Sequence, residues 1–219
     1  MTVTDTLSIA KRREAGLAEL SDVASPPPVL VAVTKTQPDA AISEILATGQ
    51  RVFGENRVQE AEVRWAGRRG AYPDLELHLI GPLQTNKAED AVRLFDVIET
   101  LDRPKLADAL AKAMAKVGRT LPVLIQVNTG EEPQKAGIAP NELQSLLQYA
   151  RDKGLDVQGL MCIPPVDEPA GPHFALLAKL AKDSGLPVLS MGMSSDYTTA
   201  ARFGSTHVRV GSALFGPRS

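Results

Sequence analysis

The chain is poor in the residues that build disulfides, metal centres and aromatic clusters. Its 219 residues include one cysteine and three histidines, and only 4% are aromatic. The lone thiol, Cys162, cannot form an internal disulfide, and a single thiol is typical of a protein from a reducing compartment. His78, His173 and His207 stand too far apart to form a ligand-spaced cluster. We therefore expect structural roles for the histidines and no metal site.

Charge of one sign and long apolar runs are also missing. The 24 basic and 26 acidic side chains leave a formal charge of -2, which provides no positive field for a nucleic acid backbone or an anionic membrane. No run reaches the roughly 18 apolar residues of a membrane span, and the amino terminus lacks a secretory signal pattern. We expect a cytoplasmic protein that binds neither nucleic acid nor membrane.

What is present is the composition of an ordinary globular protein, with 43% hydrophobic and 23% charged residues. Short β-rich runs alternate with helical stretches. The expected strands cover residues 29–35, 51–55, 75–80, 96–101, 122–128, 157–163, 188–193 and 207–214. The helices assigned between them run from Pro38 to a stop at Gly49, and over about 57–69, 104–117 and 140–153.

Eight strands separated by helices favour one architecture. Parallel strands joined by helical crossovers need cover on their outer face, and eight of them close into a barrel. The predicted fold class is α/β, a (β/α)8 TIM-type barrel that forms a single domain over residues 1–219. The alternative is an open doubly wound sheet, which would have a glycine-rich turn after its first strand. Residues 34–38 contain no glycine, and neither GxGxxG nor GxxxxGK[ST] occurs in the chain.

The amino-terminal residues 1–25 are expected to cover the last wall of this barrel. The eighth strand is expected to extend to Leu214, which leaves no room for a final helix. Residues 5–20 have apolar side chains at helical spacing, among them Leu7, Leu17 and Leu20. We therefore expect an additional amino-terminal helix in the vacant place.

The first candidate for chemistry is Lys35. Functional residues of such barrels lie at the carboxyl ends of the strands, and Lys35 continues the first strand on the side shared by Val31 and Val33. If that side faces the interior, the amine lies at the barrel mouth, where partial burial favours the uncharged, nucleophilic form. A nucleophilic lysine is what Schiff base chemistry requires.

Strands seven and eight end in residues suited to a phosphate group. The segments GMSS at 192–195 and VGSA at 210–213 place backbone amides and short donors where barrels commonly bind phosphate; taken singly, each also fits a plain tight turn. Arg209 stands two residues before Gly211, within reach of a phosphorylated ring across the mouth. Its guanidinium only donates, so a ring nitrogen that accepts from it must be unprotonated.

Seven motifs in consistent order are far more specific than any one of them. They are VAVTKTQP around Lys35, RVFGENRVQE from Arg51, HLIGPLQTNK from His78, LIQVNTGEEPQKAGI from Leu124, GLMCIPP from Gly159, LSMGMSSD from Leu189 and STHVRVGSALFG from Ser205. Together they cover nearly the whole chain. In these motifs the sequence resembles the pyridoxal phosphate homeostasis proteins, single-domain relatives of the alanine racemase barrel known as fold type III.

The resemblance implies a set of residues that bind pyridoxal 5′-phosphate. They are Lys35 as the Schiff base residue, Asn56 beside the ring, Arg209 at the pyridine nitrogen, and Ser194, Gly211 and Ser212 at the phosphate. Thr34 and Ser212 depart from the commonest pattern but keep a hydroxyl. Lys135 resembles a family lysine that meets the cofactor transiently, although we expect a solvated loop lysine here.

The resemblance also implies a function in intracellular vitamin B6 homeostasis. We expect a monomer without catalytic residues that holds pyridoxal phosphate and delivers it to apoenzymes that depend on it. The alternative is an amino acid racemase of the alanine racemase type, which needs a base on each face of the substrate. Lys35 could serve one face; Tyr197 is the one tyrosine placed near the expected site, and we expect no further domain to supply another base. A phosphosugar aldolase would fit the barrel but not the ordered motifs.

Overall fold

The architecture is a closed barrel of eight parallel strands. The structure, a computed structural model, describes residues 7–216. Each strand pairs with the next in sequence, and β8 pairs with β1, so the sheet has no free edge. The strands are β1 (Val29–Val33), β2 (Val52–Glu55), β3 (Glu76–Leu79), β4 (Val97–Leu101), β5 (Val123–Val127), β6 (Val157–Cys162), β7 (Val188–Met193) and β8 (His207–Val210). The predicted (β/α)8 fold is confirmed.

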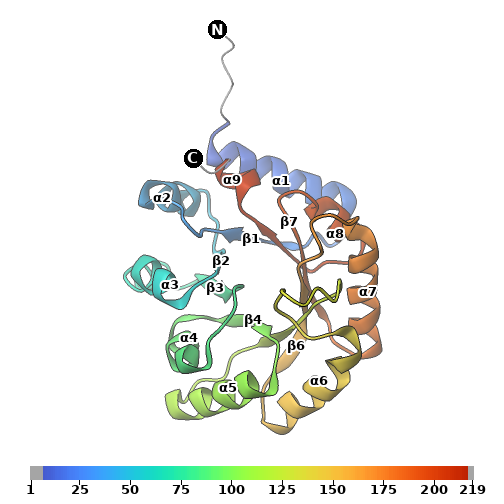
Figure 1. The fold of residues 1–219 in the computed structure, drawn as a ribbon. Helices are drawn as coiled ribbons and strands as arrows, with labels where there is room; N and C mark the ends of the chain where they lie inside the picture. Colours follow the sequence, from blue (N-terminus) through green and yellow to red (C-terminus); the bar gives the residue numbers. More distant parts are fainter. Residues whose placement is uncertain (1–6, 217–219) are drawn as a thin grey trace.

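Helices surround the strands on the outside, as Figure 1 shows. They are α1 (Ile9–Val23), α2 (Asp39–Ala47), α3 (Val58–Trp65), α4 (Ala88–Leu94), α5 (Pro104–Val117), α6 (Leu143–Asp152), α7 (Ala170–Asp183), α8 (Tyr197–Arg202) and α9 (Ser212–Phe215), with 3₁₀ turns η1 (Thr85–Lys87) and η2 (Pro140–Glu142). Local signals set several ends: α5 starts at Pro104 and stops at Gly118, which has the left-handed φ of 71° that suits glycine. No helix within residues 7–216 is long and apolar enough to cross a bilayer.

The end of the chain differs from the expectation. The eighth strand stops at Val210, and residues 212–215 form the one-turn helix α9, in which Leu214 and Phe215 donate backbone hydrogen bonds to the Gly211 carbonyl. The expected strand end at Leu214 and the expected absence of a final helix were therefore wrong. Four residues, three of them apolar, are too short a segment for periodicity to separate a strand end from one helical turn.

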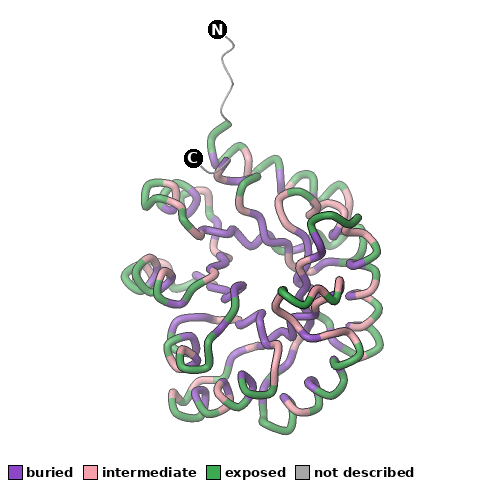
Figure 2. The backbone as a smooth tube through the Cα atoms, viewed as in Figure 1, coloured by how far each residue is buried: buried purple, intermediate pink, exposed green. Residues whose placement is uncertain are grey.

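The apolar core lies between the barrel wall and its helices. Figure 2 shows the buried residues along the strands and on the inward sides of the helices. All five residues of β5 are buried, as expected for a parallel strand that is covered on both faces. Under α3, the rings of Phe53 and Trp65 pack with centroids 4.5 Å apart.

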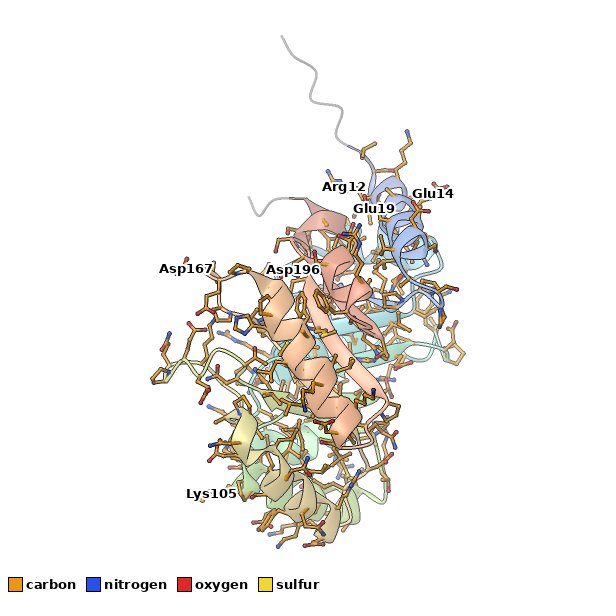
Figure 3. All side chains as sticks on the ribbon, turned by 90° about the vertical axis from the view of Figure 1, so that its right-hand side faces the viewer. Arg12, Glu14, Glu19, Lys105, Asp167 and Asp196 are labelled. Carbon is orange, nitrogen blue, oxygen red and sulfur yellow. The ribbon has the colours of Figure 1, made fainter. Side chains whose placement is uncertain are left out.

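Helix α1 covers the wall formed by the last and first strands, packing against α2, α8 and α9. Leu20 is fully buried, and a Cβ at Gly16 would lie 3.7 Å from Leu30 Cδ1, so the helix approaches β1 closely. In Figure 3, Arg12 and Glu19 lie on α1 beside the carboxyl-terminal helices; Arg12 donates to the Leu214 carbonyl, and Tyr197 donates to Glu19. The expected covering helix is thus present, while residues 1–6 of that segment lie outside the described residues.

We propose that α1 is an integral part of one barrel domain, and this predicts a large effect of truncating its buried side chain. Leu20→Ala should lower the free energy of unfolding by about 2–5 kcal/mol, the range for large-to-small changes in a packed core. Lys11→Ala, on the exposed side of the same helix, should change it by less than about 0.5 kcal/mol. Urea unfolding of both variants measures this, and equal, small effects would show that α1 is only an appendage.

Candidate functional site

A cavity of about 330 Å³ lies at the carboxyl ends of the strands. It is lined by Val33, Lys35, Thr36, Gln37, Asn56, Ile80, Ile163, Met193, Ser194, Ser195, Arg209, Gly211, Ser212 and Gly216. All six residues expected to bind a cofactor are in this set. The volume is within the range of small-ligand pockets. The structure therefore brings the predicted site residues together, while their roles toward a ligand stay predictions.

Lys35 lies half-buried in this cavity, two residues beyond the end of β1. The next residue, Thr36, has a φ of 62°, a left-handed conformation that is costly for a β-branched residue. Such strain is of the order of 1–3 kcal/mol and is retained where the surrounding structure imposes it, commonly at functional sites. The chain thus turns sharply at the point where the lysine enters the cavity.

A buried carboxylate behind the barrel wall holds this turn. Thr34 donates to Glu55 Oε1 over 2.5 Å, and the same oxygen accepts from Arg64 Nη1 at 2.6 Å and Trp65 Nε1 at 3.0 Å. Neighbouring side chains of extended backbone point to opposite faces. Anchoring Thr34 on the outer side therefore directs Lys35 to the inner side. The sequence analysis missed Glu55; its only signal was a carboxylate that ends a buried strand.

Asn56 is held in the cavity wall by a close backbone approach. A Cβ at Gly81 would lie 2.2 Å from the Asn56 carbonyl oxygen. Only glycine therefore allows the chain after β3 to pass this close to the chain after β2. The GEN and IGP segments of the sequence meet at this contact.

The two loops expected to bind phosphate meet at one oxygen atom. Ser194 Oγ accepts backbone hydrogen bonds from Gly211 N at 3.0 Å and from Ala213 N at 3.2 Å. The Asp196 carboxylate accepts from Met193 N at 2.6 Å and so fixes the loop after β7. The hydroxyl accepts from both amides, and its own proton remains available to a ligand in the cavity.

Arg209 lies at the cavity with its guanidinium almost completely buried, 4% exposed. It donates to Ser190 Oγ and to the Cys162 carbonyl, both over 2.7 Å. Burial raises the pKa of the Cys162 thiol to about 12. A thiolate is the reactive form of cysteine, and the Cys162 side chain is not among the residues that line the cavity, so we expect no nucleophilic role for it.

Charged side chains continue from Arg209 through the barrel interior. Glu99 is fully buried, with Oε2 3.9 Å from Arg209 Nη1 and Oε1 2.6 Å from His78 Nδ1. His78 Nε2 lies 2.8 Å from Glu76 Oε1. Burial alone would lower the pKa of His78, but hydrogen bonds and charges from Glu76 and Glu99 raise it to about 9. Sequence reasoning missed Glu99 and Ser190, because single polar residues inside strands give no sign of their partners.

Other candidate residues lie away from the cavity. The Lys135 amine pairs with Glu132 over 2.6 Å in the loop after β5, and the Tyr197 hydroxyl is bonded to Glu19 on α1. His173 contacts Thr129 and Glu168. In the described part of the chain, no group of three or more potential ligands could hold a metal ion.

Comparisons with known proteins place the chain in a family. Residues 13–219 match the family described as alanine racemase, N-terminal domain. A pyridoxal phosphate homeostasis protein of Pseudomonas aeruginosa is 42% identical over 217 residues, covering 95% of this chain and 92% of that protein. The solved structure of PipY from Synechococcus elongatus with PLP (pyridoxal phosphate) bound is 39% identical, with a TM-score of 0.83, and the match covers 95% of this chain and 100% of PipY. An alanine racemase of Clostridium difficile, 13% identical, has a TM-score of 0.74 and shares the fold alone, over 95% of this chain and 57% of the racemase.

The buried His78 predicts a defined dependence of stability on pH. Its pKa is about 9 when folded and about 6.5 when unfolded, so its contribution is complete below pH 6.5 and is lost as the pH rises through 9. At about 1.4 kcal/mol per tenfold change in proton affinity, this contribution is of the order of 3 kcal/mol. Urea unfolding across this range should show the advantage of the unmodified protein over His78→Gln shrinking with rising pH.

His207→Gln is the matched control, because burial lowers the pKa of His207 and places its effect at lower pH. A constant difference between the unmodified protein and His78→Gln from pH 6.5 to 9 would show that His78 is not charged in the fold.

Proposed function

Because this chain belongs to the pyridoxal phosphate homeostasis protein family, we propose that it binds pyridoxal 5′-phosphate at the carboxyl-end cavity and takes part in vitamin B6 homeostasis. The relative from Pseudomonas aeruginosa has this function in its name, and PipY was solved with the cofactor bound. The proposal transfers their ligand to the corresponding cavity of this chain. The fit rests on the groups that line the cavity.

Those groups suit a phosphorylated aromatic aldehyde. When bound, pyridoxal phosphate supplies an aldehyde that condenses with a primary amine, and Lys35 is the one primary amine among the described lining residues. Ser194 Oγ accepts from the amides of Gly211 and Ala213, so its own proton is left to donate to the phosphate, and the Ser212 hydroxyl adds a second short donor. Asn56 and Ile80, which directly follow β2 and β3, line the ring pocket in this proposal.

Arg209 suits the ring nitrogen. Its guanidinium can only donate, so it favours a ring nitrogen without a proton, which is a weaker electron sink than a protonated one. The residue therefore supports binding of the cofactor more than use of the cofactor for carbanion chemistry.

The single observation that favours a carrier over a racemase is the small number of charged side chains that line the cavity. Among the described residues that line it, Lys35 and Arg209 are the only charged side chains, and no tyrosine, histidine, cysteine or carboxylate is present. Racemization needs a base on each face of the substrate, and Arg209 stays protonated. Tyr197, the alternative base, faces α1, and burial together with Glu19 raises its pKa to about 12.

We further propose that this carrier acts as a monomer in the cytoplasm and releases pyridoxal phosphate to apoenzymes that depend on it. The buried, unpaired Cys162 fits a reducing compartment. The cavity lies at the strand ends, and in this proposal the amine of an acceptor would enter there to take over the aldehyde. Lys135, paired with Glu132, is a loop residue in this proposal.

Lys35→Ala tests the attachment point. The variant should lose the visible absorption band of the protein-bound cofactor and the borohydride-fixed peptide, because the remaining lining residues contain no primary amine. Its unfolding free energy should stay within about 0.5 kcal/mol, since a half-buried residue at the mouth contributes little packing. Lys116→Ala, on the exposed side of α5, is the matched control, and the same fixed peptide in Lys35→Ala would disprove the assignment.

The carrier function predicts transfer without turnover. Protein loaded with pyridoxal phosphate should restore the activity of an apoenzyme, and single enantiomers of common amino acids should racemize no faster than with free cofactor. Chiral chromatography measures the rate of racemization. Enantiomer conversion of the order of 1 per second or faster, abolished in Lys35→Ala, would establish the racemase instead.

A further inference from the structure

Arg209 is held by two hydrogen bonds from its guanidinium. The guanidinium has five N–H donors, and two of them are engaged with described residues, the Ser190 hydroxyl and the Cys162 carbonyl, each at 2.7 Å. The carbonyl belongs to the backbone of β6 and is fixed by the barrel. The hydroxyl proton of Ser190, on β7, can rotate about the Cβ–Oγ bond, so its direction depends on a further hydrogen-bond acceptor.

Glu99 determines that orientation. Since arginine only donates, Ser190 Oγ must accept from Arg209, and its one proton must go elsewhere. Glu99 Oε2 lies 2.5 Å from Ser190 Oγ and accepts it. Within residues 7–216, Glu99 is also the one carboxylate within 4 Å of the guanidinium, at 3.9 Å. Glu99 thus compensates the charge of Arg209 and orients the Ser190 hydroxyl, which accepts from the guanidinium.

The charge of Glu99 is secured from the other side. Burial alone would raise its pKa, but His78, Arg209 and Ser190 hold it below its usual value. Both ring nitrogens of His78 lie against carboxylates, of Glu99 and Glu76, so both are donors and the ring is cationic. His207, with its ring centroid 5.7 Å from that of His78, is the other titratable group at this end.

Four side chains therefore form a row of alternating charge across the barrel interior: Arg209, Glu99, His78 and Glu76. It runs from the ligand cavity to a second cavity of about 270 Å³ at the amino ends of the strands, lined in part by Glu76, His78 and His207. Buried ion pairs contribute little net stability compared with apolar packing, whereas removing one partner leaves a costly unpaired charge. The row is therefore better explained by the position that it gives Arg209, at the ligand cavity, than by a gain in stability.

We propose that Glu99 and Ser190 are positioning residues that hold Arg209 at the cofactor pocket, an inference that rests on the proposed binding of pyridoxal phosphate. Neither residue lines the ligand cavity; both act through the guanidinium. Losing either should leave covalent attachment at Lys35 possible and change the environment of the ring nitrogen and the retention of the cofactor.

The test uses Ser190→Ala and Glu99→Gln with Thr100→Val as the matched control. Thr100 is next to Glu99, equally buried, and its hydroxyl has no partner among the described residues, so its removal deletes a buried hydroxyl outside the row. In Ser190→Ala and Glu99→Gln, borohydride should still label Lys35. The release rate of pyridoxal phosphate should rise about tenfold, the effect of losing one hydrogen bond to a charged group, and the ring-nitrogen NMR signal of labelled cofactor should shift.

A measurement on the protein without cofactor separates this inference from the proposed function. The guanidinium NMR signals of Arg209 should be resolved in the unmodified protein and in Thr100→Val, and averaged by rotation in Ser190→Ala. If the unmodified protein is not labelled at Lys35, the proposed function fails, and the guanidinium signals still decide the positioning role. Resolved Arg209 signals in folded Ser190→Ala, the milder variant, would overturn the inference whatever Glu99→Gln does.

Discussion

Pairing of β1 with β8 is the constraint on which the site depends. Val31 is in register with Arg209, and Ala32 with Val210, so the first strand of the chain delivers Lys35 beside the loop that follows the last strand. The remaining pairings complete the barrel and place the other strand ends around the same cavity. Helix α1 and the short α9 cover this same wall, which links the packing of the amino-terminal segment to the geometry of the cavity.

The barrel separates two kinds of interior. Between the strands and the helices the packing is apolar, as parallel strands covered by helices require. Inside the barrel, Arg209, Glu99 and His78 occupy positions that apolar side chains usually fill in this fold. Each of these buried charges needs a partner of opposite charge. In this barrel the partners belong to the row of Arg209, Glu99, His78 and Glu76. The permanently charged member at the ligand cavity, Arg209, therefore has a fixed place, and this favours a ligand atom that accepts a hydrogen bond.

The chemistry of the cavity follows from how few charged groups line it. In the function proposed here, one amine, one guanidinium and the hydroxyls of Ser194 and Ser212 hold an aldehyde, a ring nitrogen and a phosphate. The same proposal assigns no base to the second face of a substrate. The strained turn at Thr36 and the anchor of Thr34 on Glu55 add precision to the position of the amine without adding a second base.

Local signals in the sequence predicted the fold and, together with the family resemblance, six of the residues that line the cavity. The alternation of short apolar runs with helical segments predicted the closed barrel, and the rule that barrel function lies at the strand ends selected Lys35, Asn56 and Arg209, because strand ends are visible in a sequence. Strand eight was extended too far, since one helical turn after Val210 has no periodicity of its own. Only the tertiary structure revealed that Glu99 and Ser190 hold Arg209 and that Glu55 anchors Thr34. These residues come from strands far apart in the chain, and a buried polar side chain has no identifiable partner until the closed barrel brings the two within hydrogen-bond distance.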